Sequence, residues 1–255
     1  MSRMPVLFLG HGSPMNAIEQ NKYSDAWIEL GKTLPKPEAI LCVSAHWFTR
    51  GTRINDSLAP KMVYDMYGFP DALYRVTYPA SGAPEIAQQT AHLLRGRATI
   101  DNSWGLDHGS WSVLLRLFPN ADIPVFQVSV DATAPVQEHF DLGEALRPLR
   151  KEGVLILGSG NVVHNLRMVD WERSGGFDWA QTFDSYIKEN VIQRTFDNVL
   201  QYQRAGSSAQ LSVPTPDHFF PLLTVLGASD AGDSVRVLTE ACVLGSLSMT
   251  GYLFQ

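Results

Sequence analysis

Histidines at the ends of apolar runs are the residues of this sequence best suited to chemistry. His11, His46 and His164 each follow a run of the kind that forms a buried strand. Those runs occupy residues 6–10, 39–45 and 153–158. Imidazole binds transition metals and exchanges protons near neutral pH, so gathered histidines can hold a metal ion or move a proton. One histidine at a strand end is usually structural, whereas three in equivalent places favour a shared site.

The alternation of strands and helices predicts how these histidines meet. Residues 123–130 have the pattern of a further strand, and residues 21–34, 84–95 and 135–151 have the pattern of helices. Such alternation favours an α/β fold with a mostly parallel central sheet and helices on both faces. Open α/β sheets bind ligands at the carboxyl ends of their strands, which is where the three histidines are expected.

The C-terminal part of the chain is expected to complete the same domain. Residues 235–243 and 246–254 alternate like an antiparallel hairpin that turns at Gly245. No internal repeat, low-complexity segment or clear boundary interrupts the 255 residues. We therefore expect residues 1–255 to form a single α/β domain, with an antiparallel C-terminal hairpin beside the parallel strands.

Two loops rich in glycine, proline or polar residues separate these elements. Residues 49–84 contain several aromatic anchors and indicate a long ordered loop, a feature that is often functional. Residues 101–110 are polar, and they precede a short apolar helix expected at residues 111–117. His108 lies in this second loop, beside glycine.

The remaining histidines fall into two groups. His218 follows a Pro-Thr-Pro-Asp segment and joins His11, His46, His108 and His164 in a candidate site. His92 and His139 lie in helical stretches of mixed polarity and are expected at the surface. Several histidines without a Cys-x-x-Cys motif suit zinc, iron, copper or nickel. The alternative is that the five act separately, as hydrogen-bonded structural residues.

Composition narrows the partners and the compartment. The formal net charge is −6 and no basic run stands out, which disfavours nucleic acid as a partner. The sequence shows no signal-peptide pattern and no apolar segment of membrane-spanning length, so no membrane partner is expected. The two cysteines, Cys42 and Cys242, lie in apolar runs and fit a reducing, cytoplasmic location.

Six motifs, in order through nearly the whole chain, carry a resemblance to a known family. They are Gly-His-Gly-Ser-Pro at 10–14, Ser-Ala-His-Trp at 44–47, Tyr-Gly-Phe-Pro at 67–70, Asp-His-Gly-Ser-Trp at 107–111, Gly-Ser-Gly-Asn-Val-Val-His-Asn at 158–165 and Pro-Thr-Pro-Asp-His at 214–218. With these motifs the sequence resembles the class III extradiol ring-cleavage dioxygenases, and among them the 4,5-DOPA extradiol dioxygenases. That family opens catechol rings beside the two hydroxyls, using O2 and non-haem Fe(II).

The resemblance also implies roles for the five histidines. His11 and His46 match the two metal-binding histidines of the family, and His218 takes the place of the glutamate found in the protocatechuate branch. Three histidines depart from the pattern of two histidines and one carboxylate. His164 matches the acid/base histidine, and His108 matches a second histidine of the pocket.

The implied reaction joins a small catechol to O2. We expect Fe(II) to be the active metal and DOPA to be cleaved at the 4,5 bond to a muconate semialdehyde. His164 would remove a proton from the catechol as a general base. Zn(II) can occupy the same site in purified protein, because it binds nitrogen sites more tightly than Fe(II), and His164 would then serve as a fourth ligand. The loop at residues 62–74 is expected to cover the pocket with its aromatic side chains.

Three other functions fit part of the pattern. Tetrapyrrole metal chelatases also place His-Gly-Ser after a first strand, but they leave the motifs around His108 and His218 unexplained. A zinc hydrolase would use several histidines and a bound water, although the sequence has no His-Glu-x-x-His motif. A zinc-binding protein without enzymatic activity would close the site with four histidines.

Overall fold

The computed structural model describes residues 3–255, and its strands form one main sheet. The strand order is β5-β4-β6-β2-β8-β1-β12-β9. These strands are β1 (Val6–Gly10), β2 (Ala39–Ser44), β4 (Thr52–Asn55), β5 (Ala98–Ile100), β6 (Val125–Val128), β8 (Val154–Gly160), β9 (Val235–Leu238) and β12 (Gly251–Phe254). Two short pairs lie outside this sheet: β3 (Phe48–Thr49) with β7 (Val130–Asp131), and β10 (Cys242–Val243) with β11 (Leu247–Ser248).

The centre of the sheet is parallel, as the sequence predicted. Strands β6, β2, β8 and β1 pair in parallel, with β8 between β2 and β1. The C-terminal strands are antiparallel: β12 pairs with β1 and β9, and the β10–β11 hairpin turns at Gly245, whose φ is +76°. Glycine adopts this left-handed conformation without steric cost. The predicted C-terminal hairpin is therefore confirmed.

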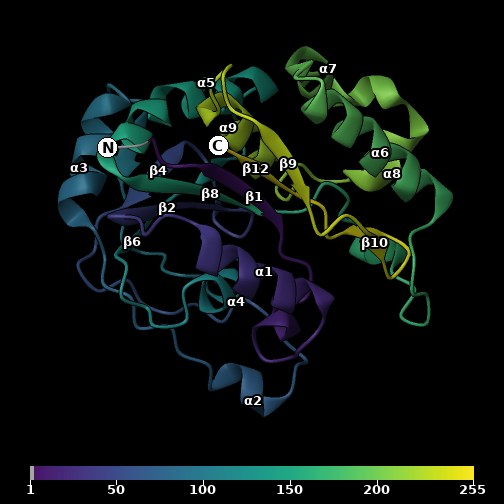
Figure 1. The fold of residues 1–255 in the computed structure, drawn as a ribbon, viewed down its shortest axis with the longest axis horizontal. Helices are drawn as coiled ribbons and strands as arrows, with labels where there is room; N and C mark the ends of the chain where they lie inside the picture. The colour runs from purple at the N-terminus through teal and green to yellow at the C-terminus, as the bar shows by residue number, and fades with distance from the viewer. Residues whose placement is uncertain (1–2) are drawn as a thin grey trace.

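Helices cover both faces because strand side chains alternate between two hydrophobic cores. On β1, Val6 and Phe8 enter one core, and Leu7 and Leu9 enter the other. Figure 1 shows α5 and α9 on one side of the sheet and α1 and α4 on the other. The helices are α1 (Lys22–Thr33), α2 (Asp71–Tyr74), α3 (Pro84–Leu93), α4 (His108–Leu117), α5 (Val136–Leu146), α6 (Asp178–Ile192), α7 (Phe196–Leu200), α8 (Ser207–Ser212) and α9 (Phe220–Ala228). Within residues 3–255, none of them has the length and apolar character needed to cross a bilayer.

Helix α4 begins earlier than its apolar residues predict. Asp107 is its N-cap, and its side chain accepts a hydrogen bond from the backbone N–H of Ser110 at 3.0 Å. This cap satisfies one of the free N–H groups of the first turn and draws residues 108–110 into the helix. His108 therefore lies on the first turn of a helix and not in a loop.

The long segment at residues 49–84 is ordered, as predicted, and it folds back against α4. The hydroxyl of Tyr64 donates to the carbonyl of Val76 at 2.6 Å, and the indole N–H of Trp111 donates to the carbonyl of Val63 at 3.1 Å. These bonds hold residues 62–66 beside the start of α4. Tyr67, in contrast, is 92% exposed.

Candidate metal centre

His11 and His46 meet because their strands flank β8. His11 directly follows β1, and His46 lies two residues after β2. Both strands run parallel to β8, so their carboxyl ends lie side by side at one edge of the sheet. The Nε2 atoms of the two rings are 3.2 Å apart.

His218 reaches the same edge from the segment before α9. Its backbone carbonyl accepts a hydrogen bond from the N–H of Asn161 at 2.8 Å, which ties this segment to the end of β8. A Cβ atom at Gly160 would lie 2.1 Å from the same carbonyl, so only glycine allows this approach. One ring nitrogen from each of His11, His46 and His218 lies within 4.8 Å of the others.

The hydrogen bonds of Ser159 fix the tautomer of His11. The hydroxyl of Ser159 donates to the carbonyl of Gly109 at 2.5 Å. Because a hydroxyl has one proton to donate, it accepts from Nδ1–H of His11, 3.0 Å away. Nε2 of His11 then carries a lone pair, which is the form of imidazole that binds a metal.

Carboxylates orient the other two rings in the same way. Nδ1 of His46 lies 2.9 Å from Asp65, and Nδ1 of His218 contacts Asp217. A carboxylate accepts the Nδ1 proton and leaves Nε2 available, an arrangement common behind metal-bound histidines. Nε2 of His218 is buried and has no hydrogen-bond partner among residues 3–255. A transition metal would satisfy this atom, so the donor set fits such an ion.

Asp65 connects two of the five histidines. Besides His46, it accepts hydrogen bonds from the backbone N–H of His108 at 2.9 Å and from its Nδ1 at 3.0 Å. The ring of His108 lies 3.9 Å from that of His46, centroid to centroid. Asp65 was not predicted from the sequence, although it is the only acidic residue among the aromatic side chains of residues 62–70.

Asp107 holds the supports of the site in place. Its buried carboxylate accepts hydrogen bonds from Ser44 at 2.6 Å, from the indole of Trp104 at 2.9 Å and from the amide of Gln127 at 3.2 Å. These partners come from β2, from the loop before α4 and from β6. A buried carboxylate with so many donors fixes the end of β2 relative to α4. It thereby also fixes the backbone position from which His46 extends.

Burial sets the protonation of the cluster. It lowers the pKa of His11 and of His218 well below the usual value, and neighbouring histidine charges lower both further. Burial also lowers the pKa of His164, to about 4. Burial would lower the pKa of His46 as well, but hydrogen bonding to Asp65 and the negative charges of Asp65, Asp107 and Asp217 together outweigh it and raise that pKa. Although burial opposes the shift, His108 and His46 together hold the pKa of Asp65 far below its usual range.

His164 adjoins the three-histidine group from the side of β8. Its ring lies against that of His218, with centroids 3.4 Å apart and planes 7° apart. All five histidines predicted for the site are therefore together. Of the other two, His92 is exposed on α3, as predicted. His139 was wrongly predicted at the surface: it is 2% exposed, because α5 packs against α9 and places its ring 4.3 Å from that of Phe220.

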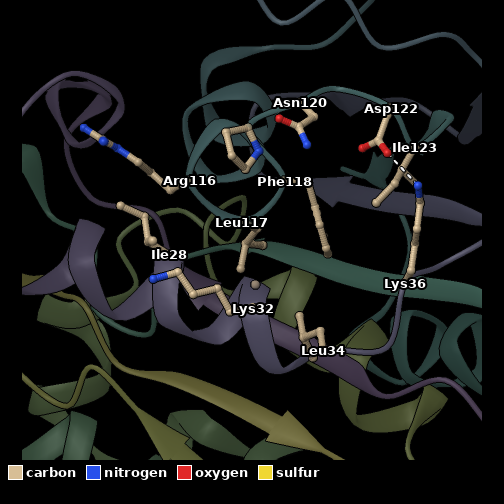
Figure 2. A pocket seen from close by; sticks show the side chains of 12 residues that line it. Ile28, Lys32, Leu34, Lys36, Arg116, Leu117, Phe118, Asn120, Asp122 and Ile123 are labelled. Atoms are coloured by element: carbon tan, nitrogen blue, oxygen red, sulfur yellow. Dashed lines mark hydrogen bonds and ion pairs between the residues drawn. The ribbon is translucent and has the colours of Figure 1, made fainter.

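A separate cavity of about 400 Å³ lies between α1 and the segment that follows α4 (Figure 2). Apolar side chains such as Ile28, Leu34 and Leu117 line it, and the ion pair of Lys36 with Asp122, at 2.5 Å, spans one side. None of the five histidines borders this cavity. It is therefore distinct from the histidine cluster.

Comparisons with known proteins agree along the whole chain. The family described as the catalytic LigB subunit of aromatic ring-opening dioxygenase matches residues 5–255. A protein of Escherichia coli K12 named 4,5-DOPA dioxygenase extradiol is 48% identical over 97% of this chain and 93% of its own. A protein of Beta vulgaris with the same name is 36% identical over 97% of this chain and 95% of its own.

A solved structure shares the fold of the whole chain. The crystal structure of an uncharacterized protein from Escherichia coli K12 superimposes with a TM-score of 0.88 at 43% identity. The match covers 99% of this chain and 100% of that one. The mostly parallel sheet and its antiparallel C-terminal strands are thus shared with a relative of known structure.

Proposed function

The chain belongs to the LigB family of aromatic ring-opening dioxygenases, and on that premise we propose that it cleaves a DOPA-like catechol at one three-histidine metal site. It is an extradiol dioxygenase, which inserts O2 into an aromatic ring with the help of a metal. The relatives named for 4,5-DOPA support DOPA as the substrate, with a muconate semialdehyde as the product. A chelatase, a zinc hydrolase or a zinc-binding protein without activity would not explain why the chain matches a family of ring-opening dioxygenases.

The ligand set rests on one observation: three imidazoles turn their Nε2 atoms toward one place while protein acceptors hold each Nδ1. His11, His46 and His218 would hold the ion. When bound, an Fe(II) ion would act as a Lewis acid and lower the pKa of a catechol hydroxyl. It would also supply the positions where catechol and O2 meet. Three protein ligands leave such positions open on the ion.

His164 is proposed as the group that moves protons. Its ring is beside His218 and on the border of a cavity, where a catechol hydroxyl can approach it. A neutral imidazole there accepts the proton of the second hydroxyl and returns it when the oxygen–oxygen bond breaks. His108, which Asp65 orients through Nδ1, is left with Nε2 to hydrogen-bond substrate or oxygen.

Fe(II) is proposed as the active metal, and Zn(II) as a competitor for the same nitrogens. Zinc binds nitrogen sites more tightly than Fe(II) and favours four ligands. The ring of His164, already in contact with that of His218, is placed to become the fourth ligand. Zinc-loaded protein should then be inactive, because the proton carrier would be bound to the metal.

Metal analysis combined with oxygen uptake tests the proposed function. Protein loaded with Fe(II) without oxygen should contain about one metal per chain and consume O2 when L-DOPA is added, with one O2 used per ring opened. Mass spectrometry of the product should show a gain of both oxygen atoms and a semialdehyde. Zinc-loaded protein is the matched control and should consume none. Metal binding without oxygen uptake on any catechol would overturn the assignment.

A further inference from the structure

A small cavity next to His164 offers a place for the part of the substrate that does not react. Its volume is about 210 Å³, and it lies between the segment after β8 and the segment before His218. His164 and Asn165 border it on one side, Pro214 and Asp217 on the other, and Arg167 also lines it. A catechol whose hydroxyls approach His164 would extend a ring substituent into this cavity.

The backbone that carries Arg167 is firmly held. Asn165 accepts a hydrogen bond from the N–H of Arg167 at 3.2 Å and donates its amide to the carbonyl of Leu211 at 2.7 Å. Ser246 fixes Asn165 from both sides: its carbonyl accepts from the Asn165 N–H at 3.1 Å, and its hydroxyl donates to the Asn165 carbonyl at 2.8 Å. Arg167 therefore projects from a fixed position three residues after His164.

The charge of Arg167 is not balanced by a neighbour. Among residues 3–255, no carboxylate lies within 4.0 Å of its guanidinium, and no hydrogen bond from its side chain is formed. Arg167 is the only lysine or arginine that lines the cavity. Asp217, the only carboxylate there, already accepts from Nδ1 of His218. The cavity thus presents one guanidinium without a partner, and a guanidinium binds a carboxylate through two parallel hydrogen bonds.

We propose that Arg167 binds a carboxylate carried by the side chain of the catechol, so that the enzyme selects catechols with a short anionic substituent. This inference rests on the proposed function, because it assumes that a catechol is the substrate at the histidine site. It assigns a residue for specificity outside the metal cluster. Arg167 acts by orienting the ring substituent and takes no part in proton transfer.

The test compares two substrates in four proteins. Fe(II)-loaded wild type, Arg167→Gln, Arg167→Lys and Arg204→Gln are assayed by oxygen uptake with 3-(3,4-dihydroxyphenyl)propionate and with neutral 4-methylcatechol. Arg204 is the matched control, since it is an exposed arginine on a short helix that does not line this cavity. The measured quantity is the ratio of kcat/KM for the carboxylated catechol to that for the neutral one. The ratio cancels differences in metal loading between preparations.

Loss of a charged hydrogen-bond pair should lower this ratio about 10–100-fold in Arg167→Gln, chiefly through KM for the carboxylated substrate. Arg167→Lys should recover part of the ratio, because it keeps the charge but loses the paired geometry. Arg204→Gln should match the wild type. An unchanged ratio in Arg167→Gln, with both substrates cleaved by the wild type, would overturn this inference alone. A wild type that cleaves neither catechol would overturn the proposed function, and the inference with it.

Discussion

The ring of His164 lies flat against the ring of His218, 3.4 Å away between centroids. Only one of these two residues is proposed to hold the active Fe(II). If His164 moves protons and does not bind Fe(II), His164→Gln should retain iron and bind catechol while turnover falls about 10²–10⁴-fold. Iron content and single-turnover ring cleavage on the same anaerobically loaded variant measure both effects.

A ligand would behave otherwise at this position. Loss of a ligand would weaken iron binding and activity together, and excess Fe(II) would restore much of the activity. Near-normal cleavage by His164→Gln with iron bound would remove His164 as the base, and His108 would become the candidate.

The ligand assignment of His218 predicts loss of metal. His218→Ala removes the imidazole whose Nε2 atom is buried without a partner among residues 3–255. Metal retention should therefore fall to a small fraction of one equivalent after dialysis. His92→Ala is the matched control, because His92 is exposed on α3 and belongs to none of the groups of residues that could hold a metal. A full equivalent of metal in His218→Ala would show that the ligand set is wrong.

Asp65 should matter for metal binding although it is not proposed as a ligand. Asp65→Asn keeps the size of the side chain, but its amide nitrogen cannot accept the Nδ1 proton of either His46 or His108. One of the two rings then loses its orientation, and metal affinity should fall about 10–100-fold. Competition with a chromophoric chelator measures the affinity, with Asp71→Asn, which changes an exposed aspartate at the start of α2, as the control. Equal affinities in both variants would contradict this role.

Much of the fold and the site could be predicted because strand ends place their residues by geometry. The apolar runs before His11, His46 and His164 are buried strands that belong to the parallel centre of the sheet, so local pattern was enough to bring these residues to one edge. The role of Asp65 was not predictable in this way. It depends on a loop that folds back to contact His108, 43 residues further along the chain.

Helix packing and helix capping explain why His139 and His108 were placed wrongly from the sequence. His139 has the spacing of a surface residue on α5, but α5 packs against α9, which covers part of its polar face. His108 was assigned to a loop because the apolar residues of α4 begin only at Trp111, whereas the cap supplied by Asp107 starts the helix three residues earlier. The burial of His139 depends on a contact between distant segments, which periodicity does not record. The cap of α4 is local, but it lies outside the apolar pattern from which the helix was predicted.

Asp184 is a buried carboxyl on α6 that is separate from the histidine cluster. It accepts hydrogen bonds from the hydroxyls of Ser248 at 2.5 Å and Thr250 at 2.8 Å. Burial nevertheless raises its pKa to about 6. The folded state therefore holds this proton more tightly than the unfolded state, whose aspartates have a pKa of about 3.9. This difference contributes to the free energy of unfolding. The contribution is fully present below the pKa of the unfolded state and is lost as pH rises through the pKa of the folded state.

Asp184→Asn should remove this pH dependence, because an amide does not titrate and can still hydrogen-bond both hydroxyls. A shift of about two pKa units corresponds to roughly 3 kcal/mol. Between pH 4 and pH 7, the free energy of unfolding of Asp184→Asn should therefore rise by about that much relative to that of the wild type. Urea unfolding of the two metal-free proteins across this range measures the difference and avoids proton competition at the metal site. Glu189→Gln, which changes an exposed carboxylate on the same helix, should follow the wild type. A difference between Asp184→Asn and wild type that stays flat from pH 4 to pH 7 would mean that Asp184 titrates at its ordinary pKa, and that its hydroxyl partners outweigh its burial.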